Sequence, residues 1–212
     1  MKKTLVFIAF IFFYTLNCFS QNKQKYNLSA GITNSSLRGN ELIKDNDSRL
    51  DYLIGVGITY HLKNKISLKG EINYVRKKIS SIRTVYDEFT RLISKTEEVT
   101  NFDYLSIPIL LKFEFGNNNR LYINAGPSMS FLLNTHSEII SQEDNLNDNA
   151  NIFDLAISAG LGKKFELDKT NSLTIEVRHS LGLLNTSSVY DLNNESVKTT
   201  TTNFILSWNF SL

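Results

Sequence analysis

Residues 102–133, FDYLSIPILLKFEFGNNNRLYINAGPSMSFLL, hold two runs of alternating apolar and polar side chains on either side of a short polar turn. Because side chains alternate across a strand with a period of two, this pattern predicts an antiparallel β-hairpin. The apolar side chains of both strands lie on one face of the hairpin only if Phe115 pairs with Leu121 or the register shifts by two residues. A shift of one residue would move every side chain of one strand to the opposite face. The turn is then Gly116 to Arg120, where glycine and asparagine supply permissive backbone dihedrals.

Each strand of this hairpin reaches the ~9–11 residues that a tilted strand needs to cross a bilayer. The same alternation recurs elsewhere along the 212 residues, and no long apolar segment follows the N-terminus. The further predicted strands are 26–33, 51–62, 65–75, 152–167, 172–184 and 199–212. The connections are alternately long (35–50, 76–101, 134–151, 185–198) and short (63–64, 116–120, 168–171). We therefore predict an all-β fold, an antiparallel up-and-down transmembrane β-barrel of about eight strands, with residues 76–101 extending two strands beyond the membrane.

The N-terminus has the features of a secretory signal peptide. Lys2 and Lys3 precede an apolar stretch at 5–16, and the small residue Ser20 follows it. We predict a signal peptide at 1–20, cleaved near Ser20, and an outer-membrane β-barrel domain at 21–212. A membrane anchor helix would need a longer apolar run. A lipoprotein is disfavoured because Asn17, before the single cysteine, is not small.

Cleavage would change the bulk charge of the chain. It would remove two of 23 basic residues and leave 23 − 2 = 21 against 21 acidic ones, a net charge of zero. A chain without a global basic field offers no case for nucleic acid as a partner. We expect outer-membrane lipid as its surroundings and other envelope proteins as further partners. The oligomeric state stays open.

Periodicity does not say which face lies outside, and a soluble sandwich or a lipocalin-like barrel would bury the apolar face instead. Three features favour the membrane. The polar face is rich in glycine, as a narrow interior requires. Aromatic residues lie near the ends of the apolar faces, as in interfacial girdles. Charges on the polar face come in opposite-sign pairs, two residues apart on one strand, as enclosed charges must. These pairs are Lys69 with Glu71, Lys112 with Glu114, and Glu176 with Arg178.

We predict that these six residues form a structural charge network inside the lumen, with a summed charge of zero. The alternative is ordinary surface charge on a soluble sheet. Because an interior of about eight strands is filled by its own side chains, we expect no open pore.

Three short motifs carry a family resemblance. They are Ile107-Pro108-Ile109-Leu110, Ala125-Gly126-Pro127 and the late Gly-Leu-Leu-Asn at 182–185. Through these motifs the chain resembles the outer-membrane β-barrel domain common in Bacteroidota, often called PorT-like. The resemblance covers most of residues 21–212. The resemblance implies the barrel fold. Some members of that family are implicated in protein secretion and surface motility, so a component of such an assembly is the second hypothesis for function.

No catalytic, cofactor-binding or metal site can be assembled from the sequence. Histidines occur at 61, 136 and 179, but adjacent residues such as His136 and Ser137 point to opposite faces and form no triad. The acidic loop with Glu138, Glu143, Asp144 and Asp148 lacks the spacing of a calcium loop, and we expect a solvated anionic loop. The leading hypothesis is a structural or interaction role through the extracellular loops. A lipid-modifying barrel enzyme is the third hypothesis.

Overall fold

The computed structural model describes residues 24–39, 47–86, 92–116, 120–139, 142–144, 152–185 and 197–211. The predicted signal peptide and its cleavage site near Ser20 lie outside these residues. In the described part of the chain no helix is long and apolar enough to cross a bilayer.

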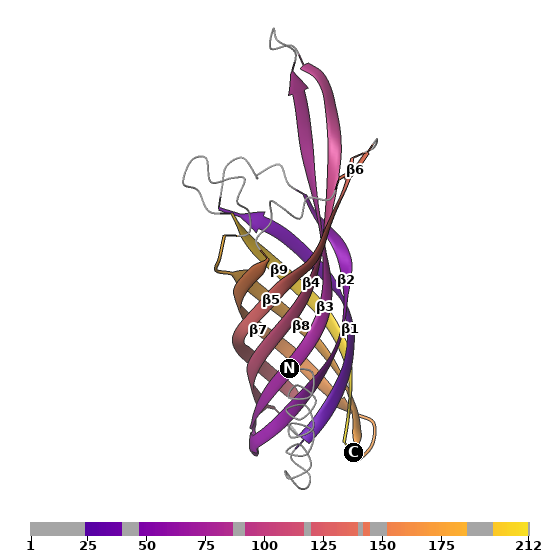
Figure 1. Cartoon of the computed structure of the whole chain (residues 1–212). Coiled ribbons are helices and arrows are strands. Elements are labelled where there is room, and N and C mark those ends of the chain that lie inside the picture. The colour runs from indigo at the N-terminus through magenta and orange to yellow at the C-terminus, as the bar shows by residue number, and fades with distance from the viewer. Residues whose placement is uncertain are drawn as a thin grey trace, which may run out of the picture.

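Eight long antiparallel strands close into a barrel (Figure 1). Neighbours pair in the order β4-β3-β2-β1-β9-β8-β7-β5, and pairing of β4 with β5 closes the ring. A ninth strand, β6, is three residues long and pairs only with β5. The predicted fold class, an eight-stranded up-and-down barrel, is confirmed. The strands are β1 (Gln24–Arg38), β2 (Asp47–Lys63), β3 (Ile66–Tyr86), β4 (Leu92–Phe115), β5 (Leu121–Ile139), β6 (Gln142–Asp144), β7 (Phe153–Glu166), β8 (Asn171–Gly182) and β9 (Lys198–Phe210).

The central hairpin has the predicted register. Phe115 lies opposite Leu121, and the apolar side chains of β4 and β5 share the outer face. Gly116 opens the turn with a φ of +80°, a left-handed conformation that glycine adopts without steric cost. The period-two pattern thus places every side chain of this hairpin up to Phe131 on the expected side of the wall.

The barrel is apolar outside and polar inside, the reverse of a soluble protein. Leu111 and Ile123 on the outer face are 54% and 49% exposed, whereas Asn124 and Lys112 on the inner face are 2% and 8% exposed. A large exposed apolar belt of this kind is stable only against an apolar solvent. The prediction that the apolar face lies toward lipid is confirmed by this arrangement.

Aromatic pairs border the apolar belt at two levels. Near the short turns these are Tyr26 with Phe210, Trp208 with Phe210, and Phe113 with Phe115; at the other level they are Tyr52 with Tyr74 and Phe131 with Phe153. On β5 the belt runs from Leu121 to Phe131, which is 131 − 121 = 10 residue steps. At ~3.3 Å per residue and a tilt of ~40° this spans ~25 Å, the height of the apolar band of outer-membrane barrels.

The two ends of the barrel differ. The short connections β2–β3, β4–β5 and β7–β8 lie at one end together with the last described residues, and the long connections lie at the other (Figure 1). There β3 and β4 continue as a paired hairpin far above the ring, up to the pair Tyr86 and Leu92. The prediction that residues 76–101 extend two strands beyond the membrane is confirmed for 81–86 and 92–98, whereas Lys77 lies inside the lumen and 87–91 lie outside the described residues.

Two predicted loops are shorter than expected. The segment 35–50 was predicted to be a long connection, but β1 continues to Arg38 and pairs there with β9. The segment 134–151 was also predicted to be a long connection, but β5 continues to Ile139 and pairs with β6. Both predictions are wrong in part. Outside the bilayer a strand needs only a hydrogen-bonded partner, so its sequence need not alternate between apolar and polar residues, and the pattern does not reveal it.

Pro108 and Pro127, which lie in the middle of their strands, interrupt the β4–β5 ladder without shifting its register. The pairs Pro108–Ser128 and Leu111–Ala125 have the same register, and the residues between them on β4 and β5 are not paired with each other, although they pair with β3 and β7. Proline has no N–H to donate to the ladder. The register shift between β4 and β5 lies instead between Asp103 and Tyr104.

Candidate functional site

A closed ring of four charges occupies the lumen. Lys69 and Glu71 come from β3, and Glu176 and Arg178 come from β8. These strands lie four positions apart in a ring of eight, so the pairs face each other from opposite walls. Because side chains alternate along each strand, all four point into the lumen. The eight-stranded barrel is narrow enough for side chains from opposite walls to meet.

Each cation of the ring contacts both carboxylates. Lys69 Nζ lies 2.5 Å from Glu71 Oε1 and 3.3 Å from Glu176 Oε2. Arg178 Nη1 lies 2.6 Å from Glu71 Oε2, and its Nη2 lies 2.6 Å from Glu176 Oε1. The four side chains are only 1–4% exposed. The charges therefore alternate in sign around the ring and sum to zero.

Two neutral side chains complete the ring. Tyr122 Oη donates to Glu176 Oε2 over 2.9 Å, and Asn73 Nδ2 donates to Glu71 Oε2 over 3.1 Å. Tyr122 fits because the facing residue on β7 is Gly162: a Cβ there would lie 2.3 Å from the tyrosine ring. The glycine of the polar face thus makes room for a large lumen side chain.

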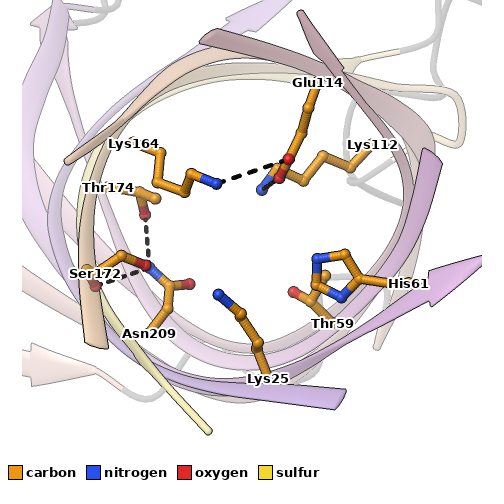
Figure 2. Close-up of a pocket in the computed structure, with 9 residues that line it drawn as sticks. All are labelled: Lys25, Thr59, His61, Lys112, Glu114, Lys164, Ser172, Thr174 and Asn209. Carbon is orange, nitrogen blue, oxygen red and sulfur yellow. Dashed lines mark hydrogen bonds and ion pairs between the residues drawn. The ribbon is translucent and has the colours of Figure 1, made fainter. Parts of the chain in front are cut away.

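The remaining predicted charges form a second cluster toward the short turns (Figure 2). Lys112 Nζ lies 2.7 Å from Glu114 Oε1, and Lys164 Nζ from β7 lies 3.8 Å from Glu114 Oε2. Lys112 also lies 4.2 Å from the ring centroid of Tyr122, which links the two clusters. Lys164 is absent from the sequence prediction, although continuing the β7 alternation two residues beyond Gly162 would have found it.

Above the ring the lumen holds a third level that sequence reasoning missed. Lys77 Nζ lies 4.6 Å from the ring centroid of Tyr104, and Thr199 Oγ1 donates to Asp154 Oδ2 over 2.8 Å. Lys77 was predicted to lie beyond the membrane, so its burial at 8% exposure was not expected. The side chains of Leu53, Val75 and Ile205 form a buried apolar cluster.

The candidate histidines occupy separate places. His61 lines the cavity beside the second cluster. His179 is exposed on the outer face, where its Nδ1 lies 2.9 Å from Thr202 Oγ1, and the β8 register beside it is regular. The side chain of His136 and the acidic side chains of 138–148 lie outside the described part of the chain. Within the described residues no three His, Cys, Asp or Glu side chains are grouped as metal ligands.

Several solved structures of outer-membrane proteins are similar to this chain. Neisserial surface protein A is 10% identical, with a TM-score of 0.50 over 88% of this chain and 97% of that one. OprG from Pseudomonas aeruginosa is 13% identical, with a TM-score of 0.49 over 91% and 99%. Ail, the attachment invasion locus protein of Yersinia pestis, is 12% identical, with a TM-score of 0.43 over 89% and 100%. No curated protein matches the chain in sequence.

Residues 19–188 match the family described as outer membrane protein beta-barrel domain. This match covers more than half of the chain and agrees with the closed barrel, its apolar belt and its polar lumen. The chain therefore belongs to the outer membrane protein beta-barrel domain family, and it resides in the cell outer membrane.

Proposed function

We propose that this protein is a sealed outer-membrane barrel that acts as a surface interaction protein through the end bearing the long connections. In barrels of this kind the short turns face the periplasm and the longer loops face the exterior. The observation that carries the proposal is the β3–β4 hairpin, which projects far beyond the rest of the barrel (Figure 1). Loops and projections held by a rigid scaffold are where binding functions concentrate.

The hairpin offers backbone edges to a partner. Pairing of β3 with β2 ends at Ser80, and pairing of β4 with β5 ends at Val99, whereas β3 and β4 stay paired up to Tyr86 and Leu92. In the described part of the chain, the six residues from Ser81 to Tyr86 pair only with β4. Exposed strand edges accept an added strand from another chain. A partner that adds an extended segment to this hairpin is the mode of binding we propose.

The filled lumen supports an interaction role over transport. The four-charge ring, Tyr122 and the apolar cluster of Leu53, Val75 and Ile205 all occupy the interior, and Tyr122 is 1% exposed. An eight-stranded interior is just wide enough for its own side chains.

Co-purification from native membranes tests the proposal. A variant that replaces residues 81–98 by Asn-Gly shortens the hairpin, and a control variant replaces the short turn 117–119 at the other end. We expect crosslinking on intact cells to capture a partner with the wild type and the control but not with the shortened variant. Equal capture by all three would contradict a role for the hairpin.

A second candidate is a component of a secretion or surface-motility assembly, as the PorT-like resemblance suggests. Two motifs of that resemblance meet in space: a Cβ on Gly126 would lie 2.1 Å from the backbone oxygen of Ile109. The motifs thus describe one close contact between β4 and β5. A deletion strain with unchanged secreted proteins would exclude this candidate, and unchanged acyl chains in its outer-membrane lipid would exclude a lipid-modifying enzyme.

A further inference from the structure

We propose that the lumen cavity at the short-turn end binds a small phosphate-type oxyanion. We call this cavity the basic vestibule. Figure 2 shows its side chains converging from several walls of the barrel on a common open space. Its residues are Lys25, Thr59, His61, Lys112, Glu114, Lys164, Ser172, Thr174 and Asn209.

The basic vestibule has a surplus of positive charge. Among the described residues that line it there are three ammonium groups and one carboxylate. Lys112 and Lys164 both approach Glu114, at 2.7 Å and 3.8 Å, and Lys164 also lies 3.2 Å from Glu166 Oε1. Lys25 has no ion-pair partner within the described chain, and Figure 2 shows its amine pointing into the open space. An anion in that space would neutralise a charge that the protein leaves uncompensated.

Neutral hydrogen-bonding groups complete the lining. Asn209 Nδ2 lies 3.3 Å from Thr174 Oγ1 and 3.3 Å from the backbone oxygen of Ser172, which fixes the amide on this wall. The hydroxyl groups of Thr59, Ser172 and Thr174 can each turn a proton toward a ligand. Ammonium and hydroxyl groups around one space match the several oxygens of a tetrahedral oxyanion.

The size and place of the basic vestibule limit its ligand. The cavity has a volume of about 20 Å³. A space of this size limits the ligand to a small ion, so a nucleotide or a sugar does not fit. The phosphate of a phospholipid has the same chemistry, but its ester chains would have to enter the lumen from the rim. Free inorganic phosphate is therefore the ligand we expect.

Calorimetric titration of the full barrel in phosphate-free maltoside micelles tests this inference, with inorganic phosphate added at constant ionic strength. Lys25→Met keeps the aliphatic stem and removes the charge. The matched control is Lys163→Met, because Lys163 is close to the same end but its amine lies over the Phe165 ring, 5.2 Å from the centroid. Heat-dependent mobility on gels verifies that each variant folds.

We expect one phosphate per wild-type barrel, an affinity about tenfold lower in Lys25→Met, and no change in Lys163→Met. Equal weakening in both variants would show a general response to charge and overturn the site. Absence of binding in the wild type would overturn it as well. A second titration uses vesicles that contain phosphatidylglycerol, and binding there without any binding of inorganic phosphate would also reject the inference.

Discussion

The four side chains of the lumen ring depend on one another, because each is buried and each contacts two partners of opposite charge. Taking ions out of water costs several kcal/mol each, and only mutual contact offsets that cost. Arg178 and Glu71 make their contact across the lumen, from strands that are not neighbours in the sheet. We therefore propose that the ring stabilises the closed barrel as well as filling it.

Removing one member of the ring should be costly, and removing a matched pair less so. We expect Arg178→Ala to lower the free energy of unfolding by about 3–5 kcal/mol, because Glu71 and Glu176 then share one cation. Adding Glu176→Ala should recover part of the loss, since Lys69 and Glu71 remain as a neutral pair. Urea unfolding in detergent micelles measures both changes. If each single change costs less than ~1 kcal/mol, as for exposed pairs, the charges are not enclosed together.

Gly162 and Gly70 distinguish two effects of replacing a strand glycine: a steric clash of the added methyl group and a loss of backbone flexibility. Gly162→Ala should destabilise the barrel by about 1–3 kcal/mol, because the added methyl meets the buried Tyr122 ring. Gly70→Ala is the matched control, since a Cβ at this outward position meets nothing within 4 Å. We expect the control to be neutral or slightly stabilising in the same urea measurement. Equal losses in the two variants would exclude the steric explanation.

Asp168 should titrate at an unusually low pH. In the β7–β8 turn its carboxylate accepts hydrogen bonds from the Asn171 side chain and from the backbone N–H groups of Thr170 and Asn171. These bonds, the Asn171 side chain first, lower the pKa of Asp168 from 3.8 to about 2. Its contribution to stability is therefore present above pH ~4 and lost as the pH falls through about 2.

Carbon-13 NMR titration of the Asp168 carboxyl group checks this value. Asn171→Ala should move the midpoint back toward 3.8, and Lys169→Ala, which leaves these hydrogen bonds in place, should leave it unchanged. A wild-type midpoint near 4 would contradict the hydrogen-bonded turn.

At the scale of elements, the sequence predicts the strands that lie within the bilayer, because the bilayer imposes an alternating pattern on them. A strand between lipid and a polar lumen must alternate, so the faces of β4 and β5 follow from residues 105–131 alone. Outside the bilayer this constraint ends. Residues 36–38 of β1 pair with β9, and 137–139 of β5 pair with β6, without an alternating pattern that would reveal them.

The contacts within the lumen could be predicted only in part. The sequence indicates that Glu71 and Arg178 face inward, because each has a charge of opposite sign two residues away on the same strand. It does not indicate that they meet, because this depends on the stagger of four intervening strand pairs around the barrel. Lys77 was missed for a related reason: where the belt ends on β3 depends on the tilt of the strand.

The alternation of long and short connections predicts the orientation in the membrane. Epitope tags at 35–50, 78–100, 135–151 and 186–198 should be reached by antibody on intact cells, because these segments connect the strands at the hairpin end. Tags at 63–64, 116–120 and 168–171 should be reached only after permeabilisation. The opposite pattern would invert the barrel and place the hairpin in the periplasm.

At the scale of the whole molecule, the described side chains cross the lumen at three levels. The upper level holds Lys77 and Tyr104, the middle level is the four-charge ring, and the lower level is the cluster around Glu114. A path for ions would have to break contacts in which both charges are buried. We therefore expect a barrel that interacts through its surface and whose interior, apart from the basic vestibule, is a structural core.

Ion conductance across a planar lipid bilayer tests this claim most directly. With the purified wild-type barrel inserted, we predict no steady conductance above that of the bare bilayer. Replacing all four ring residues, Lys69, Glu71, Glu176 and Arg178, by alanine should open a measurable conductance, provided that gel mobility shows a folded barrel. Steady open-channel steps from the wild-type protein would contradict the sealed lumen.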